Sequence, residues 1–146
     1  RSLGTGSVGD RTLYDYEQGT FQPEFTATGD SWSYAVKTGA YTKIGRLVHF
    51  GIKFQTNSTG GGSGNTMTIT GLPYTSSSDN QTGVSIGQIY NVQHYSSMQM
   101  IANVGPGAAA VTLAWSIDDA AWLTTTASLF DKSVLLFIVG GTYQAA

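Results

Sequence analysis

Apolar side chains recur at every second residue in three separate segments of the chain. In residues 48–54 four large apolar residues alternate with polar or small ones, and the same period runs through residues 98–104 and 111–117. Successive side chains of a strand point to opposite faces, so each segment predicts a strand with one buried face. Apolar residues at the helical spacing of 3.6 are rare along the chain. The alternation therefore predicts an all-β protein.

Turn-forming residues separate these segments. Gly45 and Arg46 lie between two strand-like segments, and a two-residue connection that starts with Gly fits a type II′ hairpin turn. Polar breakers rich in Gly, Ser, Asn and Asp occur at 57–65, 75–80, 105–107 and 118–119. Strands and turns at this spacing predict an antiparallel β-sandwich that resembles a jelly roll.

The start of the chain differs from the rest. Residues 1–19 are first Gly-rich and then polar, without alternation, and predict an extended N-terminal arm or linker joined to a portion upstream. Residues 20–146 predict the β-sandwich domain. A chain of 146 residues suits one domain, because at this size folding hides about two-thirds of the unfolded surface.

The charge balance narrows the classes of partner. Charged residues make up 11% of the chain, the net charge is −2, and the seven Lys and Arg residues are scattered. Recognition of nucleic acid requires a basic face, so no nucleic-acid partner is expected. The longest apolar run, residues 134–139, is too short to span a membrane, so no membrane insertion is expected. The absence of Cys excludes disulfides and thiolate chemistry, and no cofactor is expected.

Four sequence blocks, in the same order, resemble those of the C-terminal domains of bacteriophage tail fibres and tailspikes. The blocks, each followed by the pattern it resembles, are residues 13–23 (LYDYEQGTFQP; DYEEGTWTP), 38–48 (TGAYTKIGRLV; TGxYTKIGNLV), 69–74 (ITGLPY; ITGLPF) and 137–143 (FIVGGTY; ISGTY). The chain departs from these patterns at Gln18, Arg46 and Gly140, and Arg46 bears only on the turn subtype. Residues 76–135 match no block, so no role is carried over to them.

The resemblance implies a virion module at the distal end of a tail fibre or spike, attached to upstream fibre domains of the same polypeptide. It further implies a homotrimer that recognises a bacterial surface polysaccharide or lipopolysaccharide. Trimer formation would also cover sheet edges that otherwise invite aggregation. Two alternatives stay open: a purely structural trimer cap or folding clamp, and, with less support, a polysaccharide-degrading enzyme.

The carboxylates and histidines favour structure over catalysis. Asp15 and Glu17 would share one face of an extended segment, where we expect them to anchor the arm to a neighbouring backbone or to Arg11. Asp118 and Asp119 are typical of a turn. No second component of an active site accompanies either pair, so we expect no enzyme activity. The two histidines, at positions 49 and 94, have no partner at metal-ligand spacing.

Aromatic residues among polar neighbours are the candidate carbohydrate-binding groups. Aromatic rings can stack on the apolar faces of sugars, while amides and hydroxyls bind the sugar hydroxyls. Trp115 alternates with apolar residues and is expected in the core, whereas Trp32 is expected to be exposed. The alternative is that such residues pack a seam between subunits. The candidate binding residues are Trp32, Tyr34, Tyr90, His94, Tyr95 and Trp122.

Overall fold

A computed structural model describes residues 15–146 except 58–59, 61, 94–98, 117–120 and 131–134. Within these residues the chain forms β-strands and one short 3-10 helix, and every pair of strands is antiparallel. The elements in chain order are β1 (Tyr16–Phe21), β2 (Glu24–Thr26), β3 (Tyr34–Ile44), β4 (Leu47–Thr56), β5 (Thr68–Thr70), β6 (Thr82–Tyr90), β7 (Gln99–Val104), β8 (Ala110–Ser116), β9 (Leu123–Thr124), η2 (Ala127–Phe130) and β10 (Leu136–Gln144). The prediction of an all-β fold is confirmed.

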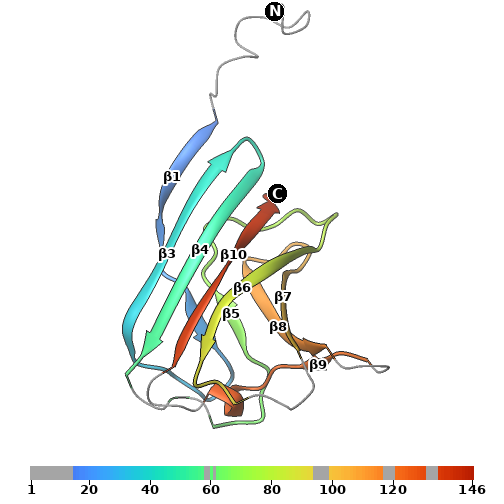
Figure 1. Ribbon diagram of the computed structural model, residues 1–146. Coiled ribbons are helices and arrows are strands. Elements are labelled where there is room, and N and C mark those ends of the chain that lie inside the picture. Colours follow the sequence, from blue (N-terminus) through green and yellow to red (C-terminus); the bar gives the residue numbers. More distant parts are fainter. Residues whose placement is uncertain (1–14, 58–59, 61, 94–98, 117–120, 131–134) are drawn as a thin grey trace, which may run out of the picture.

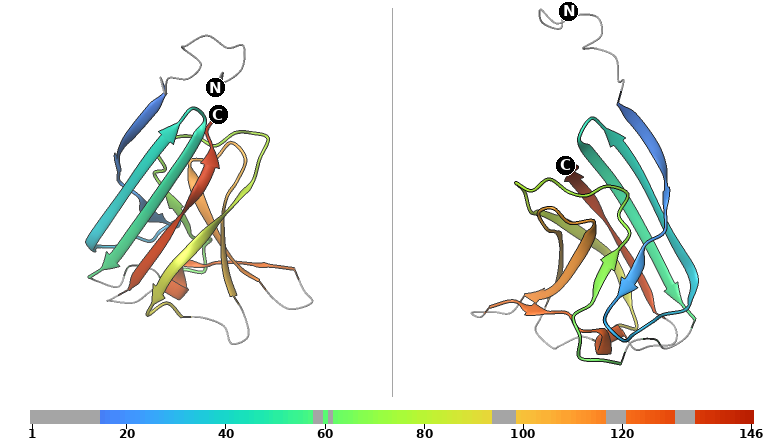
Figure 2. Two further views of the ribbon diagram at one scale, coloured as in Figure 1. Left: turned by 45° about the horizontal axis from the view of Figure 1, so that its top comes forward. Right: turned by 180° about the vertical axis from the view of Figure 1, so that it is seen from behind.

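The strands form one sheet that curls over on itself (Figures 1 and 2). Its order is β1-β3-β4-β10-β6-β7-β8-β5-β2, and β9 adds to β8. The two ends of this order, β1 and β2, are joined by only Gln22 and Pro23. The strand β6 belongs to both halves, because residues 82–84 pair with β7 and residues 85–90 pair with β10. The two layers of the predicted sandwich are thus one sheet, continuous through β6.

The core lies between the two halves of the sheet. The alternation predicted in β4 is confirmed, because Val48, Phe50, Ile52 and Phe54 are all buried. At the centre, the Phe25 ring lies 4.2 Å from that of Phe54, measured between centroids, and packs against several further aromatic rings. Burial of the apolar face of strands such as β4, β7, β8 and β10 is what drives the curl, since a lone sheet would leave this face in water.

Two glycines shape the turns. Gly45 connects β3 to β4 with φ of 59°, and Ile44 pairs with Leu47, as the predicted type II′ hairpin turn requires. Gly71, which follows β5, has φ of 91°. A Cβ atom at Gly71 would lie 2.5 Å from the carbonyl oxygen of Gln22, in the link between β1 and β2. The absence of a side chain at Gly71 therefore lets the two ends of the curled sheet approach each other.

The predicted N-terminal arm meets the sheet at β1. Residues 16–19 belong to β1, and Tyr16 pairs with Ile44 at the end of β3. Residues 1–14 lie outside the described residues, so the extended arm stays a prediction.

We expect Gly71→Ala to destabilise the domain more than Gly29→Ala. Both glycines have positive φ, but a Cβ at Gly29 meets no atom within 4 Å. Gly29→Ala should lower the free energy of unfolding by about 1 kcal/mol through backbone strain alone. Gly71→Ala adds the clash with Gln22 and should cost at least about 2 kcal/mol. Urea denaturation followed by circular dichroism measures both, and equal losses would contradict the role assigned to Gly71.

Candidate functional site

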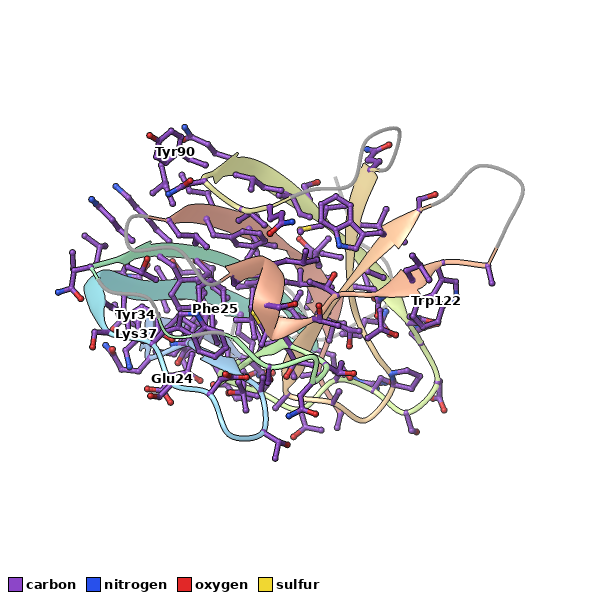
Figure 3. All side chains as sticks on the ribbon, turned by 90° about the horizontal axis from the view of Figure 1, so that it is seen from below. Glu24, Phe25, Tyr34, Lys37, Tyr90 and Trp122 are labelled. Carbon is purple, nitrogen blue, oxygen red and sulfur yellow. The ribbon has the colours of Figure 1, made fainter. Side chains whose placement is uncertain are left out.

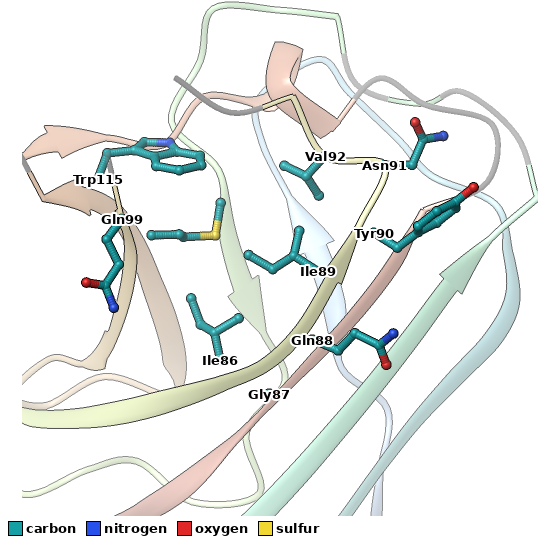
Figure 4. A pocket seen from close by; sticks show the side chains of 10 residues that line it. Ile86, Gly87, Gln88, Ile89, Tyr90, Asn91, Val92, Gln99 and Trp115 are labelled. Atoms are coloured by element: carbon teal, nitrogen blue, oxygen red, sulfur yellow. The ribbon is translucent and has the colours of Figure 1, made fainter. Parts of the chain in front are cut away.

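The sheet opens where β6 changes its pairing partner. Thr82, Gly83 and Val84 pair with residues 102–104 of β7, but from Ser85 onward β6 pairs with β10 and no longer with β7. The side chains between the separating strands line a hollow of about 540 Å³ (Figure 4). We call this hollow, together with the one that adjoins it, the β6–β7 cleft.

The interior of the 540 Å³ hollow is apolar. Ile86, Ile89, Val92 and Trp115 lie on the side of β6 that faces β7 and β8 (Figure 4), and Met100 completes the lining. Ile89 is 38% exposed, although its side chain lies on the core face, while the Trp115 ring is buried beneath. The opening of the sheet therefore makes part of the core surface accessible from outside.

Polar and aromatic residues border this apolar interior. Gln88 and Tyr90 project from the opposite side of β6 (Figure 4), and Tyr90 is 59% exposed. Asn91 ends β6 with φ of 61°, a left-handed conformation that Asn tolerates better than most residues. Gln99, at the start of β7, lies across the opening. A ligand in the hollow would meet apolar side chains inside and amide groups at the edge.

The adjoining hollow, of about 690 Å³, lies around the point where the two strands part. It shares Ile86, Gln99 and Met100 with the first hollow. Its further lining is largely small or polar, and includes Ser85 and Asn103. The described residues that line the two hollows include no Asp, Glu, Lys, Arg or His.

The predicted binding residues are not gathered in one place. Tyr90 borders the β6–β7 cleft, whereas Trp122, 61% exposed, lines neither of its hollows and lies far from Tyr90 (Figure 3). Trp32 and Tyr34 line a separate hollow of about 210 Å³ beside Glu24. The two remaining candidates, His94 and Tyr95, lie outside the described residues.

The expectation that Trp32 is exposed is wrong. Its side chain is buried, its indole Nε1 donates a hydrogen bond to the carbonyl oxygen of Phe130 at 3.2 Å, and its ring packs edge-on against Phe25. The polar residues around Trp32 belong to a loop whose own contacts keep them at the surface; Asp30, for example, accepts hydrogen bonds from Ser63. The indole ring turns inward because only the core offers it apolar neighbours.

Tyr34 is likewise held by structural contacts. Its hydroxyl oxygen accepts a hydrogen bond from the backbone N–H of Phe25 at 3.0 Å. Burial raises the pKa of Tyr34 to about 12, which keeps the hydroxyl neutral. Lys37 lies 5.1 Å from the ring centroid and also pairs with Glu24 at 2.6 Å (Figure 3). These contacts tie β2 to β3.

The carboxylates of Asp15 and Glu17 anchor β1, as predicted, but to side chains of β3 and of the segment after β5 and not to a backbone. Asp15 forms an ion pair with Lys43 at 2.7 Å. Glu17 accepts hydrogen bonds from the hydroxyls of Tyr41 and Tyr74. These bonds lower the pKa of Glu17 and raise the pKa of both tyrosines. The three partners lie on β3 and in the segment after β5, so β1 is fastened to both halves of the sheet.

The structure brings none of the remaining candidate catalytic or metal-binding groups together among the described residues. Arg11 and the Asp118-Asp119 pair lie outside the described residues. His49 is exposed, with its Nδ1 atom 3.1 Å from the hydroxyl oxygen of Thr142. In the described part of the chain, no three His, Cys, Asp or Glu residues gather in a way that could hold a metal ion. None of the described helices is long and apolar enough to cross a membrane.

Sequence reasoning missed most of the cleft. The alternation correctly assigned Met100 and Trp115 to a buried face, but it could not indicate that part of this face is accessible. Ile86 and Ile89 carried no signal of their own. A register shift interrupts the pairing of β10 with β6 beside the cleft, between Ile138 and Val139 and next to Gly87. Such a shift often marks a bend in a strand.

Comparisons with known proteins identify the fold. No model of a known protein family matches the chain, and no curated protein matches it. Among solved structures, the crystal structure of the Dettilon tailspike protein (gp208) superposes on 90% of this chain, with a TM-score of 0.77 and 21% sequence identity. The chain has a tailspike-related fold. It spans 24% of the length of that tailspike chain.

The anchoring of β1 predicts a dependence of stability on pH. The folded state lowers the pKa of Glu17 from its ordinary value of 4.5, so the carboxylate stabilises the fold above that pH. This contribution is lost as the pH falls through the lower pKa of the folded state. Glu17→Gln should therefore lose less stability than the parent when the pH falls from about 6 to about 3. Thermal unfolding at a series of pH values measures the difference.

The tyrosine donors supply the control for this measurement. A double Tyr41→Phe, Tyr74→Phe variant keeps both rings but removes both hydrogen bonds to Glu17. It should show the same shallower pH profile as Glu17→Gln. If both variants follow the profile of the parent, the lowered pKa of Glu17 does not contribute to acid sensitivity.

Proposed function

We propose that the chain is a receptor-binding module of a bacteriophage tailspike or tail fibre, and that it binds a bacterial surface polysaccharide or lipopolysaccharide in the β6–β7 cleft. The observation that carries this proposal is the chemistry of the cleft, which combines apolar and aromatic side chains with amide groups. The tailspike-related fold supports the assignment to a phage tail protein, because the superposed structure belongs to a tailspike protein.

A sugar needs both kinds of contact. The C–H faces of its ring prefer an apolar or aromatic surface, and its hydroxyls lose free energy when they leave water without new hydrogen bonds. Ile86 and Ile89 supply the first kind of surface, and the side chains of Asn91 and Gln99 supply donors and acceptors at the border. Few polar groups around an apolar interior are typical of small-molecule binding sites.

The proposed role is binding and not catalysis. The close acidic pair of the described residues, Asp15 and Glu17, is engaged with Lys43 and with two tyrosine hydroxyls. Neither carboxylate lines the cleft. A glycosidase would need two carboxyl groups on either side of the bond to be cleaved.

The proposed module acts as a homotrimer at the distal end of the virion tail, attached to upstream fibre domains of the same polypeptide. An exposed apolar row supports assembly. Ile44 of β3 pairs with Tyr16 of β1 on one side and with Leu47 of β4 on the other, and each of the three is 43–50% exposed. Contact between copies would remove this row from water. Three copies would also raise the avidity of a weak sugar site. The same row favours the second candidate function, a structural trimer cap.

The binding proposal predicts the effect of variants in the lining of the cleft. We expect the double variant Ile89→Ala, Gln99→Ala to bind immobilised bacterial lipopolysaccharide or capsule at least about tenfold more weakly, because it loses contacts worth about 1 kcal/mol each. Trp122→Ala, a change at an exposed aromatic residue that lines neither hollow, should bind as the parent does. Surface plasmon resonance against preparations from a panel of bacterial strains measures these affinities.

The outcomes separate the candidate functions. If no preparation retains the parent protein, the binding role is wrong and the structural cap remains. If the parent binds and the double variant binds equally well, the receptor site lies outside the β6–β7 cleft.

The trimer proposal predicts the mass in solution. Light scattering after size exclusion should give about 3 × 15.4 ≈ 46 kDa, since closed symmetric assemblies are the rule. Leu47→Lys places a charge in the apolar row and should shift the mass towards that of the monomer. A parent protein that stays at 15.4 kDa at all concentrations would contradict assembly through this domain.

A further inference from the structure

The two hollows of the β6–β7 cleft differ in chemistry. The inner hollow, of about 540 Å³, has an apolar lining in which Ile86 and Ile89 lie on the open side and the buried Trp115 ring lies beneath (Figure 4). The outer hollow, of about 690 Å³, adds the amide and hydroxyl groups of Gln81, Ser85 and Asn103 to a lining that also includes Val84, Ile101 and Ala102. A ligand that fills both hollows must therefore present an apolar group at one end and hydroxyls at the other.

Gln99 and Met100 lie where the two hollows meet, since both residues line both of them. The Gln99 side chain is exposed and offers both a donor and an acceptor. It can therefore bind a polar group of the ligand at the boundary between the apolar and the hydroxyl-bearing parts.

The described residues offer a ligand in the cleft no charged side chain. Those that line it are uncharged, and the two ion pairs of the described residues, Asp15 with Lys43 and Glu24 with Lys37, connect β1 and β2 to β3. The carboxylate of an acidic sugar would lose water in the cleft and find no cation among these lining residues, which is costly. The lining therefore fits an uncharged glycan.

The apolar lining of the inner hollow favours a glycan with an apolar substituent. A sugar hydroxyl placed against Ile86 and Ile89 would lose its hydrogen bonds to water without replacement. A methyl group placed there gains free energy from burial instead. An acetyl substituent joins a methyl group to a carbonyl oxygen, and this oxygen can accept a hydrogen bond from an amide such as that of Gln99. The acetyl group thus combines the two kinds of contact over the short distance that the cleft provides.

We propose that the β6–β7 cleft binds an uncharged glycan that bears N-acetyl or O-acetyl groups, with the acetyl methyl in the inner hollow and the sugar hydroxyls over the outer hollow. This inference rests on the proposed function, because it specifies the glycan that the same site takes. It distinguishes the ligand from the acidic polysaccharides that also coat bacteria.

The first test compares classes of glycan with the full chain. The probes are an array of defined oligosaccharides and bacterial polysaccharides, grouped as uncharged and acetylated, uncharged without acetyl groups, and anionic. Chitotetraose and cellotetraose form a matched pair on this array, because their backbones differ only by the acetamido group. Retained O-acetylated polysaccharides are measured again after mild alkali removes their acetyl esters.

We expect the retained glycans to be uncharged and acetylated. Loss of the acetyl group should weaken binding roughly 3- to 10-fold, the effect of exposing one or two buried carbon groups. Binding should change little as salt rises, because no charge pair is involved.

A pair of matched variants locates the acetyl group. Ile89→Gln introduces a polar side chain at the inner hollow, and Leu123→Gln makes the same kind of change at a residue of β9 that lines neither hollow. Ile89 is 38% exposed and Leu123 is 43% exposed, so both variants should fold, which circular dichroism verifies. Ile89→Gln should reduce the preference for the acetylated form to near onefold, and Leu123→Gln should leave it unchanged.

The outcomes separate this inference from the function on which it rests. Retention of no glycan of any class overturns the proposed function and the inference together. Retention of anionic glycans, or equal affinity before and after removal of acetyl groups, leaves the binding function standing and overturns the inference. An acetyl preference that survives Ile89→Gln also overturns it, because the acetyl group then binds elsewhere.

Discussion

The need to bury one face of a single long sheet determines this structure. A sheet with large apolar residues on one face is stable only when that face is covered. Almost no helix is present in the described residues to cover it, so the sheet curls and covers itself. The core around Phe25 and Phe54 forms between the two halves, and Gln22 and Pro23 join the ends of the sheet. Burial of the apolar face of the sheet thus accounts for both the stability and the curled shape of the domain.

The curl also creates the candidate site. For one sheet to form two facing halves, a strand must belong to both, and β6 does so by leaving β7 after Val84 and pairing with β10 from Ser85. The two strands separate there, and the apolar side chains of Ile86 and Ile89 are not covered by a neighbouring paired strand. The proposed glycan site is therefore a consequence of how the fold closes.

Local pattern predicted the strands but not their partners. Alternation identified the buried face of β4, of β7 and of β8, because it depends only on neighbours along the chain. The exposure of Trp32 was wrongly predicted, because its polar neighbours in sequence are not its neighbours in space. Tyr90, which was predicted from its polar surroundings, lies at the border of the β6–β7 cleft. Ile86 and Ile89 were missed as cleft residues because their accessibility depends on which strand β6 pairs with, and their partners in β10 lie about fifty positions away along the chain.

The measurement that tests the account most directly is NMR mapping of a bound glycan. The isotope-labelled chain is titrated with an oligosaccharide prepared from a bacterial polysaccharide that retains the protein. The account predicts that the largest amide shift changes fall at residues 85–92 of β6 and its end and at residues 99–103 of β7. Shift changes that gather around Trp122, or along Tyr16, Ile44 and Leu47, would contradict the assignment of binding to the β6–β7 cleft.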